Sequence, residues 1–290
     1  MRAADFEVRE LLDCRSPLPS RIILTVLPLH MKTRKVVLIT GASTGIGRAL
    51  ALVYAARGYA VAITARRQPL LEELAREIER LGGQALALGC DVTVAEQVRS
   101  AVATTQQHFG RIDCAILSAG ISEPTKAAEF KAADFQQLLQ TNLLGVAYGL
   151  EALIPVMRQQ GGGQIAAVSS LAGDRGMPGS AGYCATKAGL NALFEGMRGP
   201  LRPYGIKLVT IAPGYVQTPM TARFGKMPFV MSAEEAAQKI VRGLEQGQPV
   251  IRFPWQASWF MRFMRSLPSG WFDALTARRR PLKLEDETGK

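Results

Sequence analysis

Tyr183 and Lys187, in the segment Tyr183-Cys-Ala-Thr-Lys187, are the side chains best suited to proton chemistry. Residues four apart lie on one face of a helix, separated by one turn. A lysine ammonium beside a phenol favours the phenolate, so we expect the pKa of Tyr183 to fall towards the working pH. Such a phenol can pass a proton to or from a substrate oxygen. Two residues at one spacing also occur by chance on solvated helix faces, so the surrounding motifs decide the interpretation.

A glycine-rich turn precedes this segment, Thr40-Gly-Ala-Ser-Thr-Gly-Ile-Gly47. An apolar run at 36–40 predicts a strand before the turn, and helical spacing of apolar residues follows it. Backbone N–H groups and the dipole at a helix N-terminus favour a pyrophosphate there, and glycines let the backbone approach it closely. A plain turn is the alternative, but the strand and helix on either side favour a dinucleotide site.

Strands and helices alternate from residue 35 onwards. This rhythm predicts an α/β fold, a Rossmann-like, doubly wound parallel sheet in three αβα layers within a single domain. The predicted strands are 36–40, 59–64, 84–90, 112–117, 164–169, 207–212 and 250–254. The predicted helices are 46–57, 69–81, 94–109, one long helix over 132–159, 183–201, and a helix to 245 that a capping box at Ser232 opens.

Several motifs in order resemble the classical type of the short-chain dehydrogenase/reductase family, over residues 35 to about 250. They are T-G-A-S-T-G-I-G at 40–47, C-D-V at 90–92, S-A-G at 118–120, Asn142, Ser170, Y-x-x-x-K at 183–187 and P-G at 213–214. The resemblance implies hydride transfer between C4 of a nicotinamide and a carbon that bears oxygen. The cofactor supplies the hydride chemistry, and the protein supplies alignment and a proton.

The resemblance also implies roles for the catalytic residues. Tyr183 would donate the proton in reduction and accept it in oxidation, and Lys187 would lower the pKa of Tyr183 and hold the nicotinamide ribose. Ser170 would hydrogen-bond the substrate oxygen, whereas Ser169 beside it would face the other way, as successive strand residues do. Asn142 would position a relay water near the lysine, cap a local helix irregularity, or do both.

The end of the second strand bears on the choice of cofactor. Family members that use NAD carry an acidic residue there, but Ala65 stands at that place here, followed by Arg66 and Arg67. A guanidinium offers charge-assisted hydrogen bonds to a 2′-phosphate that a carboxylate would repel, so we expect NADP(H) rather than NAD(H). The alternative is that both arginines only solvate a loop. Asp91 would meet the adenine edge, with Val92 against the ring.

Two further segments are expected near the nicotinamide. Ser118 stands where asparagine is usual, so a shorter hydroxyl is expected to bond backbone there, while Ala119 and Gly120 allow close approach to the ribose. Pro213-Gly214 and Thr218 would flank the nicotinamide. The predicted cofactor site comprises Gly41, Ser43, Thr44, Gly45, Ile46, Gly47, Arg66, Asp91, Val92, Ala119, Gly120, Tyr183, Lys187, Pro213, Gly214, Val216 and Thr218.

The composition limits the classes of binding partner and the cellular compartment that we expect for this protein. The net charge of +11 over 290 residues makes nucleic acid, an anionic membrane surface and a phosphorylated cofactor the acidic candidates, and the lack of a nucleic-acid-binding signature argues against the first. Four cysteines without a C-x-x-C pair indicate a reducing compartment, so a cytoplasmic protein is expected. Two histidines and no Cys/His cluster predict no metal site.

Three parts are expected along the chain: an N-terminal arm at 1–34, disordered or an over-extended start, a catalytic domain at 35–252, and a C-terminal extension at 253–290. The sequence contains no run of eighteen apolar residues, so no membrane-spanning helix is predicted. The extension interleaves Trp255, Trp259, Phe260, Phe263, Met264, Leu267, Trp271 and Phe272 with Arg262, Arg265 and Arg278 to Arg280. Packing on its own domain or a partner subunit, peripheral contact of 255–280 with the inner face of a membrane, and a cover over the substrate entrance are the alternatives.

The predicted function is that of an NADP(H)-dependent oxidoreductase acting on a carbonyl or hydroxyl carbon of a hydrophobic small molecule. The loop from Pro219 to Met231 is rich in Met, Phe and Pro, which suggests an apolar lid over the substrate. A homo-oligomer is the expected assembly. The alternative function is a non-catalytic dinucleotide-binding or scaffold protein of the same fold.

Overall fold

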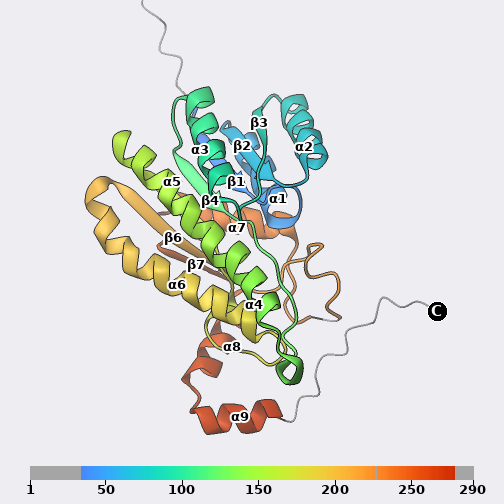
Figure 1. The fold of residues 1–290 in the computed structure, drawn as a ribbon. Coiled ribbons are helices and arrows are strands. Elements are labelled where there is room, and N and C mark those ends of the chain that lie inside the picture. Colours follow the sequence, from blue (N-terminus) through green and yellow to red (C-terminus); the bar gives the residue numbers. More distant parts are fainter. Residues whose placement is uncertain (1–33, 226, 278–290) are drawn as a thin grey trace, which may run out of the picture. The chain divides into compact units, whose positions relative to one another are not determined.

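Seven parallel strands build the central sheet, in the order β3-β2-β1-β4-β5-β6-β7 (Figure 1). The structure is a computed structural model that describes residues 34–225 and 227–277. The strands are β1 (Val36–Thr40), β2 (Ala60–Ala65), β3 (Gln84–Gly89), β4 (Cys114–Leu117), β5 (Gly163–Val168), β6 (Ile206–Pro213) and β7 (Val250–Phe253). The predicted Rossmann-like, doubly wound sheet is confirmed, and the described strands and helices form a single α/β domain.

Helices cover both faces of this sheet. One apolar cluster packs α1 (Gly45–Ala56), α2 (Gln68–Arg80) and α7 (Ala233–Glu245) against the strands. A second cluster packs α3 (Ala95–Phe109), α5 (Gly145–Gln159) and α6 (Ala181–Leu201) on the opposite face. Because both faces are covered, a central strand such as β1 is buried along its whole length, which explains its uninterrupted apolar sequence.

The strand order reverses at β1, which pairs with β2 on one side and β4 on the other. A crevice opens at such a point, outside the carboxyl ends of the strands. The Thr40 hydroxyl joins the two ends, accepting hydrogen bonds from the backbone N–H groups of Ser118, at 3.0 Å, and Ala119, at 3.2 Å. At this place the end of β1 supplies the acceptor, and whether the shorter Ser118 side chain also bonds backbone stays a prediction.

Most predicted elements agree with the structure to within about two residues, but the long helix over 132–159 does not. It consists of α4 (Ala132–Leu139), a π-helical turn (Gln140–Leu144) and α5. The turn places the Asn142 amide against the backbone of Ile121, a long-range contact that helical periodicity does not reveal. The capping box at Ser232 is confirmed, with both of its reciprocal hydrogen bonds to Glu235 present.

Within the described residues, two helices follow β7, namely α8 (Trp255–Ser266) and α9 (Ser269–Ala277). None of the helices between residues 34 and 277 has both the length and the apolarity to cross a bilayer. The predicted N-terminal arm, except for Arg34, lies outside the described residues, and so do Arg278 to Arg280. The proposed boundaries at 34 and 252 stay predictions.

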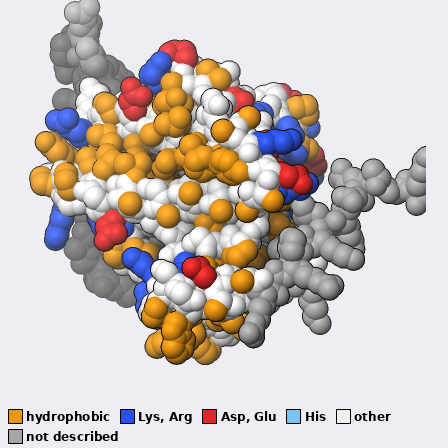
Figure 2. All heavy atoms as spheres, turned by 60° about the horizontal axis from the view of Figure 1, so that its bottom comes forward, with side chains coloured by type: hydrophobic (Ala, Val, Ile, Leu, Met, Phe, Trp, Pro, Cys, Tyr) orange, Lys and Arg blue, Asp and Glu red, His pale blue; other side chains and the backbone are white. Residues whose placement is uncertain are grey.

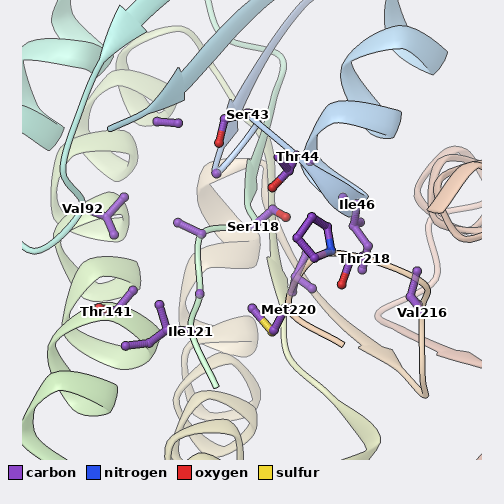
Figure 3. Close-up of a pocket in the computed structure, with 18 of the residues that line it drawn as sticks. Ser43, Thr44, Ile46, Val92, Ser118, Ile121, Thr141, Val216, Thr218 and Met220 are labelled. Atoms are coloured by element: carbon purple, nitrogen blue, oxygen red, sulfur yellow. The ribbon is translucent and has the colours of Figure 1, made fainter. Parts of the chain in front are cut away.

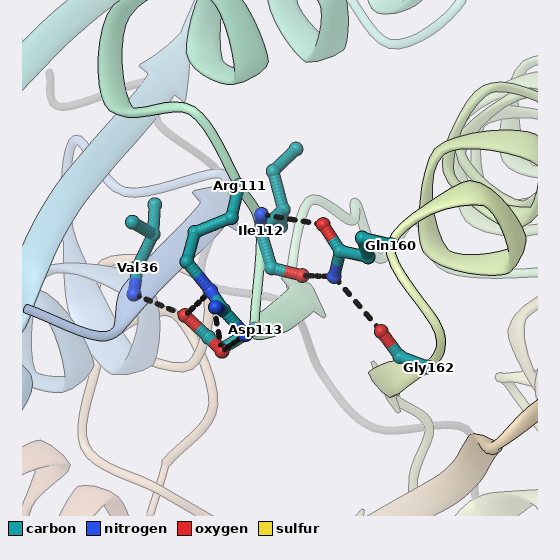
Figure 4. Close-up of polar contacts among 6 residues, drawn as sticks. All are labelled: Val36, Arg111, Ile112, Asp113, Gln160 and Gly162. Carbon is teal, nitrogen blue, oxygen red and sulfur yellow. Dashed lines mark hydrogen bonds and ion pairs between the residues drawn. The ribbon is translucent and has the colours of Figure 1, made fainter. Parts of the chain in front are cut away.

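Polar side chains fasten the amino-terminal edge of the sheet, opposite the crevice (Figure 4). The Asp113 carboxylate accepts a hydrogen bond from the Val36 N–H at 2.8 Å and pairs with Arg111 at 2.6 Å. The Gln160 amide donates to the carbonyls of Ile112, at 2.7 Å, and Gly162, at 2.8 Å, and accepts from the Ile112 N–H at 3.1 Å. Gln160 therefore supplies the partners of backbone groups that the parallel ladder leaves unpaired.

Replacing Gln160 by Ala should lower the free energy of unfolding by about 1–3 kcal/mol, because three partly buried backbone groups lose their partner. Urea denaturation of the two proteins measures the difference. Gln159→Ala is the control, since Gln159 is an exposed neighbour on the same helix and its replacement should change stability by less than about 0.5 kcal/mol. Equal effects of the two substitutions would contradict the role given to Gln160.

Candidate active site and cofactor cleft

A cleft of about 270 Å³ lies at the carboxyl ends of the strands (Figure 3). All of the residues predicted to bind the cofactor line this cleft, and so does Ser170. Asn142 is the one predicted site residue that does not line it. The fold thus brings together motifs that lie as far apart in the sequence as Gly41 and Thr218.

The glycine turn forms one wall of the cleft, and its packing leaves no room for side chains. A Cβ on Gly41, whose φ is +68°, would lie 2.7 Å from the Cα of Ala119. A Cβ on Gly47 would lie 2.4 Å from the carbonyl oxygen of Gly41. Helix α1 begins at Gly45 with no side-chain cap and no acidic residue in its first turn, so its N–H groups can bind an anion. This wall fits the pyrophosphate of a dinucleotide.

Arg66 and Arg67 lie beside the glycine turn, just past the end of β2, and both line the cleft. The Arg67 guanidinium donates to the hydroxyls of Ser43, at 2.8 Å, and Thr44, at 3.2 Å. Arg67 was not among the predicted cofactor residues, although it stood next to Arg66 in the sequence. Its contacts give this corner of the cleft a fixed positive charge, which suits a phosphate group.

Ser170 and Ser169 follow β5 and point in different directions, as predicted. The Ser170 hydroxyl lies at the cleft and accepts a hydrogen bond from the Ala172 N–H at 3.1 Å. The Ser169 hydroxyl is buried and donates to the Asn191 side-chain oxygen at 2.6 Å. Both residues line the cleft, but the Ser169 hydroxyl is already bonded to Asn191, and the role of Ser170 towards a substrate oxygen stays a prediction.

Tyr183 and Lys187 lie one turn apart on α6, with the Lys187 ammonium 5.6 Å from the centre of the Tyr183 ring. The ammonium donates to the carbonyl of Val168 at 2.8 Å. Burial raises the pKa of Tyr183 to about 12, and the neighbouring Ser170 hydroxyl acts in the opposite direction. Burial also lowers the pKa of Lys187 to about 8. The expected fall in the pKa of Tyr183 is therefore wrong for this cleft, because burial of the phenol is the largest influence on its pKa and raises it.

Asn142 is fully buried in the π-helical turn. Its side chain accepts a hydrogen bond from the Ile121 N–H at 2.8 Å and donates to the Ile121 carbonyl at 2.9 Å and the Thr186 hydroxyl at 3.2 Å. These contacts join the loop after β4 to α6, next to Lys187. Asn142 thus fixes a local helix irregularity, and the predicted relay water stays a prediction.

Apolar side chains also line the cleft, beside the hydroxyls of Thr141 and Thr218. Ile121 and Met220 line it, together with Pro219 from the predicted substrate loop (Figure 3). Arg223 of this loop pairs with Glu123 at 3.2 Å, which links the loop after β4 to the loop after β6. Ile121 was missed by the sequence analysis because no motif marks it: it follows S-A-G, and only the fold turns it towards the cleft.

The chain also matches a known family. A family model described as short chain dehydrogenase matches residues 35–228, about two thirds of the chain. The chain belongs to this family. It is a short-chain dehydrogenase/reductase, an oxidoreductase of the class that transfers hydride with a nicotinamide dinucleotide.

Three relatives show how far the similarity extends. An uncharacterized oxidoreductase of Myxococcus xanthus is 35% identical over 244 residues, covering 84% of this dehydrogenase and 96% of the relative. A 3-oxoacyl-[acyl-carrier-protein] reductase of a Synechocystis species is 35% identical over 199 residues, covering 68% of this dehydrogenase and 81% of the relative. The crystal structure of an alcohol dehydrogenase from the archaeon Thermococcus sibiricus, complexed with 5-hydroxy-NADP, has a TM-score of 0.69 and 29% identity, covering 76% of this chain and 95% of that one.

The lowered pKa of Lys187 has a consequence for stability. Its pKa is 10.5 when it is not perturbed and about 8 in the folded dehydrogenase, so between these values the unfolded chain binds a proton that the folded protein has released. Stability should therefore rise with pH in this window. In Lys187→Met this rise is absent. The free energy of unfolding of the wild type, relative to that of the variant, should therefore increase by up to about 1.4 kcal/mol per pH unit from pH 8 to about 10.

Urea denaturation across this pH range measures the difference between the two proteins. Lys207→Met is the control, because Lys207 is exposed on β6 and its ammonium stays in water when the protein folds. The difference between wild type and Lys207→Met should stay flat from pH 8 to about 10. A flat difference for Lys187→Met as well would show that the lysine is not desolvated.

Proposed function

We propose that this short-chain dehydrogenase is an NADP(H)-dependent enzyme that transfers hydride to or from a carbonyl or hydroxyl carbon of a hydrophobic small molecule. The observation that supports it best is that Ser170, Tyr183 and Lys187 line the same cleft as the glycine turn. A hydroxyl, a phenol and an ammonium at the far end of a dinucleotide cleft are the groups that a carbonyl reduction needs.

The cleft fits a dinucleotide phosphate. The turn at 41–47 would hold the pyrophosphate, and Arg66 and Arg67 would bind a 2′-phosphate, with the charge of Arg67 already directed at Ser43 and Thr44. The complex of the Thermococcus sibiricus enzyme with 5-hydroxy-NADP is consistent with this preference. The bound cofactor supplies the hydride, and everything else in the reaction falls to the side chains of this chain.

The proton is moved by Tyr183. Because burial holds its pKa at about 12, the phenol is protonated at neutral pH and is the form that donates to a carbonyl oxygen during reduction. Ser170 donates a hydrogen bond to the same oxygen and orients it. Lys187, fixed to the Val168 carbonyl, places a positive charge close to the Tyr183 ring and stabilises the phenolate that remains after transfer.

The substrate should be apolar apart from its reacting group. Ile121 and Met220 would contact it, and the ion pair of Arg223 with Glu123 would hold the two loops on either side of it. Apolar walls with a few convergent polar groups orient a substrate by its reacting oxygen and discriminate weakly among hydrocarbon chains. A ketone or secondary alcohol on a hydrophobic body fits these walls.

The competing function is a dinucleotide-binding protein without turnover. The presence of the serine, tyrosine and lysine in one cleft favours the enzyme, since a sensor needs only the glycine turn and the arginines. We also propose that the enzyme is cytoplasmic, with its described cysteines, Cys90, Cys114 and Cys184, unpaired, and that it is a homo-oligomer. No nucleic acid is expected among its partners.

Replacing Tyr183 by Phe should reduce kcat by about 10²- to 10⁴-fold, because the proton donor is lost while the ring still fills its place. Steady-state reduction of a panel of hydrophobic ketones and aldehydes with NADPH measures the loss, and fluorescence titration with NADPH should show unchanged cofactor binding. Tyr204→Phe is the control, since Tyr204 is an exposed tyrosine outside the cleft. Retained turnover in Tyr183→Phe would contradict the proposed mechanism.

The cofactor preference is tested by Arg66→Ala combined with Arg67→Ala. The affinity for NADPH should fall by about 10- to 100-fold, the value of a charge-assisted hydrogen bond to a phosphate, while the affinity for NADH stays nearly constant. Fluorescence titration with each dinucleotide measures both, and Arg76→Ala, an exposed arginine on α2, is the control. A wild type that binds NADH more tightly than NADPH would refute the preference and leave the reductase proposal intact.

A further inference from the structure

The outer face of α8 and α9 is the largest concentration of exposed aromatic side chains in the described part of the chain. All three tryptophans of the protein lie on it, Trp255 and Trp259 with 70% of their surface exposed and Trp271 with 74%. Phe260, Phe263 and Leu275 are between 49% and 58% exposed. In Figure 2, which brings the lower side of Figure 1 forward, apolar side chains gather at the lower edge of the molecule. We call these six residues the aromatic face.

The opposite side of the two helices is packed on the domain. Met261 and Met264 of α8 and Phe272 of α9 are buried, and Met261 belongs to a small apolar cluster with Leu171 and Ala212. The two helices therefore have one side that is satisfied by their own domain and one that is not. Of the alternatives for the extension, packing on its own domain is correct for the inner side and leaves the aromatic face unexplained.

Arg175 fixes this arrangement rigidly. Its guanidinium donates to the carbonyls of Met264, at 2.8 Å, and Leu267, at 2.6 Å, and lies 4.0 Å from the centre of the Phe272 ring. Asp174 beside it is buried and pairs with Arg252 at the end of the sheet. A helix pair held by such contacts presents its aromatic residues outward as a fixed surface.

The charge of this surface is positive. Arg262 and Arg265 are exposed on α8, which contains no acidic residue, and Asp273 is the one acidic residue between 255 and 277. The chain as a whole has a net charge of +11. Tryptophan and phenylalanine interleaved with arginine suit the boundary between lipid headgroups and acyl chains, where the rings enter the apolar layer and the guanidinium groups meet anionic headgroups.

We propose that the aromatic face, with Arg262 and Arg265, docks the enzyme on an anionic lipid surface. A second copy of the chain is a poorer occupant, because a symmetric contact would bring the arginines of one subunit against those of the other with almost no acidic residue to offset them. A lipid surface provides both the apolar layer and the negative charge that the face lacks.

This surface lies next to the reaction site. A Cβ on Gly214, which lines the cleft, would lie 3.1 Å from Pro254 and 3.5 Å from Ala257, so the cleft wall and the start of α8 are in contact. The segment that carries Arg175 follows Ser170 after four residues. If the proposed function holds, a lipophilic carbonyl dissolved in the membrane would reach the cleft without crossing much water; this last step rests on that function, whereas the docking itself does not.

The tryptophans make the proposal testable without a label, since any emission change reports on this face. The full chain is titrated with vesicles of phosphatidylcholine alone and of phosphatidylcholine with phosphatidylglycerol. We expect a blue shift of the emission with the anionic vesicles, quenching when their acyl chains are brominated, and reversal by high salt. Neutral vesicles should give a much smaller response.

Two variants separate the apolar and the charged contributions. Phe260→Ser with Phe263→Ser retains all three tryptophans and should weaken vesicle binding by about tenfold or more, because two rings no longer enter the acyl layer. Arg262→Glu with Arg265→Glu should weaken binding to anionic vesicles by about 25-fold or more, at about fivefold for each basic side chain lost. Leu81→Ser with Tyr204→Ser is the control for the phenylalanine variant, since it removes two exposed apolar side chains elsewhere. Arg76→Glu with Arg80→Glu is the control for the arginine variant, since it reverses two exposed charges on α2. Both controls should bind vesicles as the wild type does.

Two results would overturn the proposal. The first is no emission change and no co-sedimentation with anionic vesicles. The second is a blue shift that rises with protein concentration in the absence of vesicles, together with a lower mass of Phe260→Ser/Phe263→Ser by light scattering, which would make the face a contact between copies. Because these measurements need no turnover, they remain decisive even if Tyr183→Phe shows the proposed reaction to be wrong.

Discussion

The close approach of Gly41 to Ala119 is the constraint on which the rest of the site depends. It brings the carboxyl ends of β1 and β4 together where the strand order reverses, and the Thr40 hydroxyl holds them there through two backbone hydrogen bonds. Any side chain at position 41 would separate the strands, because the Cβ would overlap the backbone of its neighbour. The crevice opens at this point, and the start of α1 and the loop that carries Ile121 lie on either side of the contact.

The end of the cleft that holds Tyr183 and Lys187 shows how burial shifts the pKa values of two neighbouring groups. Lys187 is held in the interior by α6 and by the Val168 carbonyl, where desolvation disfavours its charge and lowers its pKa to about 8. The same surroundings raise the pKa of Tyr183 to about 12. The two shifts have one cause, since burial disfavours the charged form of each group, and they move the two pKa values apart, from 10.0 and 10.5 to about 12 and about 8. The buried phenol therefore keeps its proton more firmly than in water, while the buried ammonium gives up its proton more readily.

Much of this could be predicted from the sequence, because the decisive features are local. The strand–turn–helix at 36–57, the capping box at Ser232 and the spacing of Tyr183 and Lys187 each follow from neighbours along the chain. The failures all involve contacts between distant segments. The π-helical turn coincides with the contact of Asn142 with Ile121, the pKa of Tyr183 depends on what covers it, and the contacts of Arg67 with Ser43 and Thr44 need the glycine turn to be in place. Periodicity along one segment carries no information about what the other side of the fold brings to it.

The residues that follow Ser170 join the C-terminal helices to the wall of the cleft. Asp174 pairs with Arg252 at the end of β7, and Arg175 binds the last carbonyls of α8. A buried carboxylate that lost Arg252 would be left without its counter-ion, so this connection resists rupture more than an exposed ion pair does. The segment 171–175 therefore has two neighbours, Ser170 before it and the helices α8 and α9 beyond it. The outer helices are thus attached to the segment next to Ser170 by an ion pair and by hydrogen bonds to backbone carbonyls.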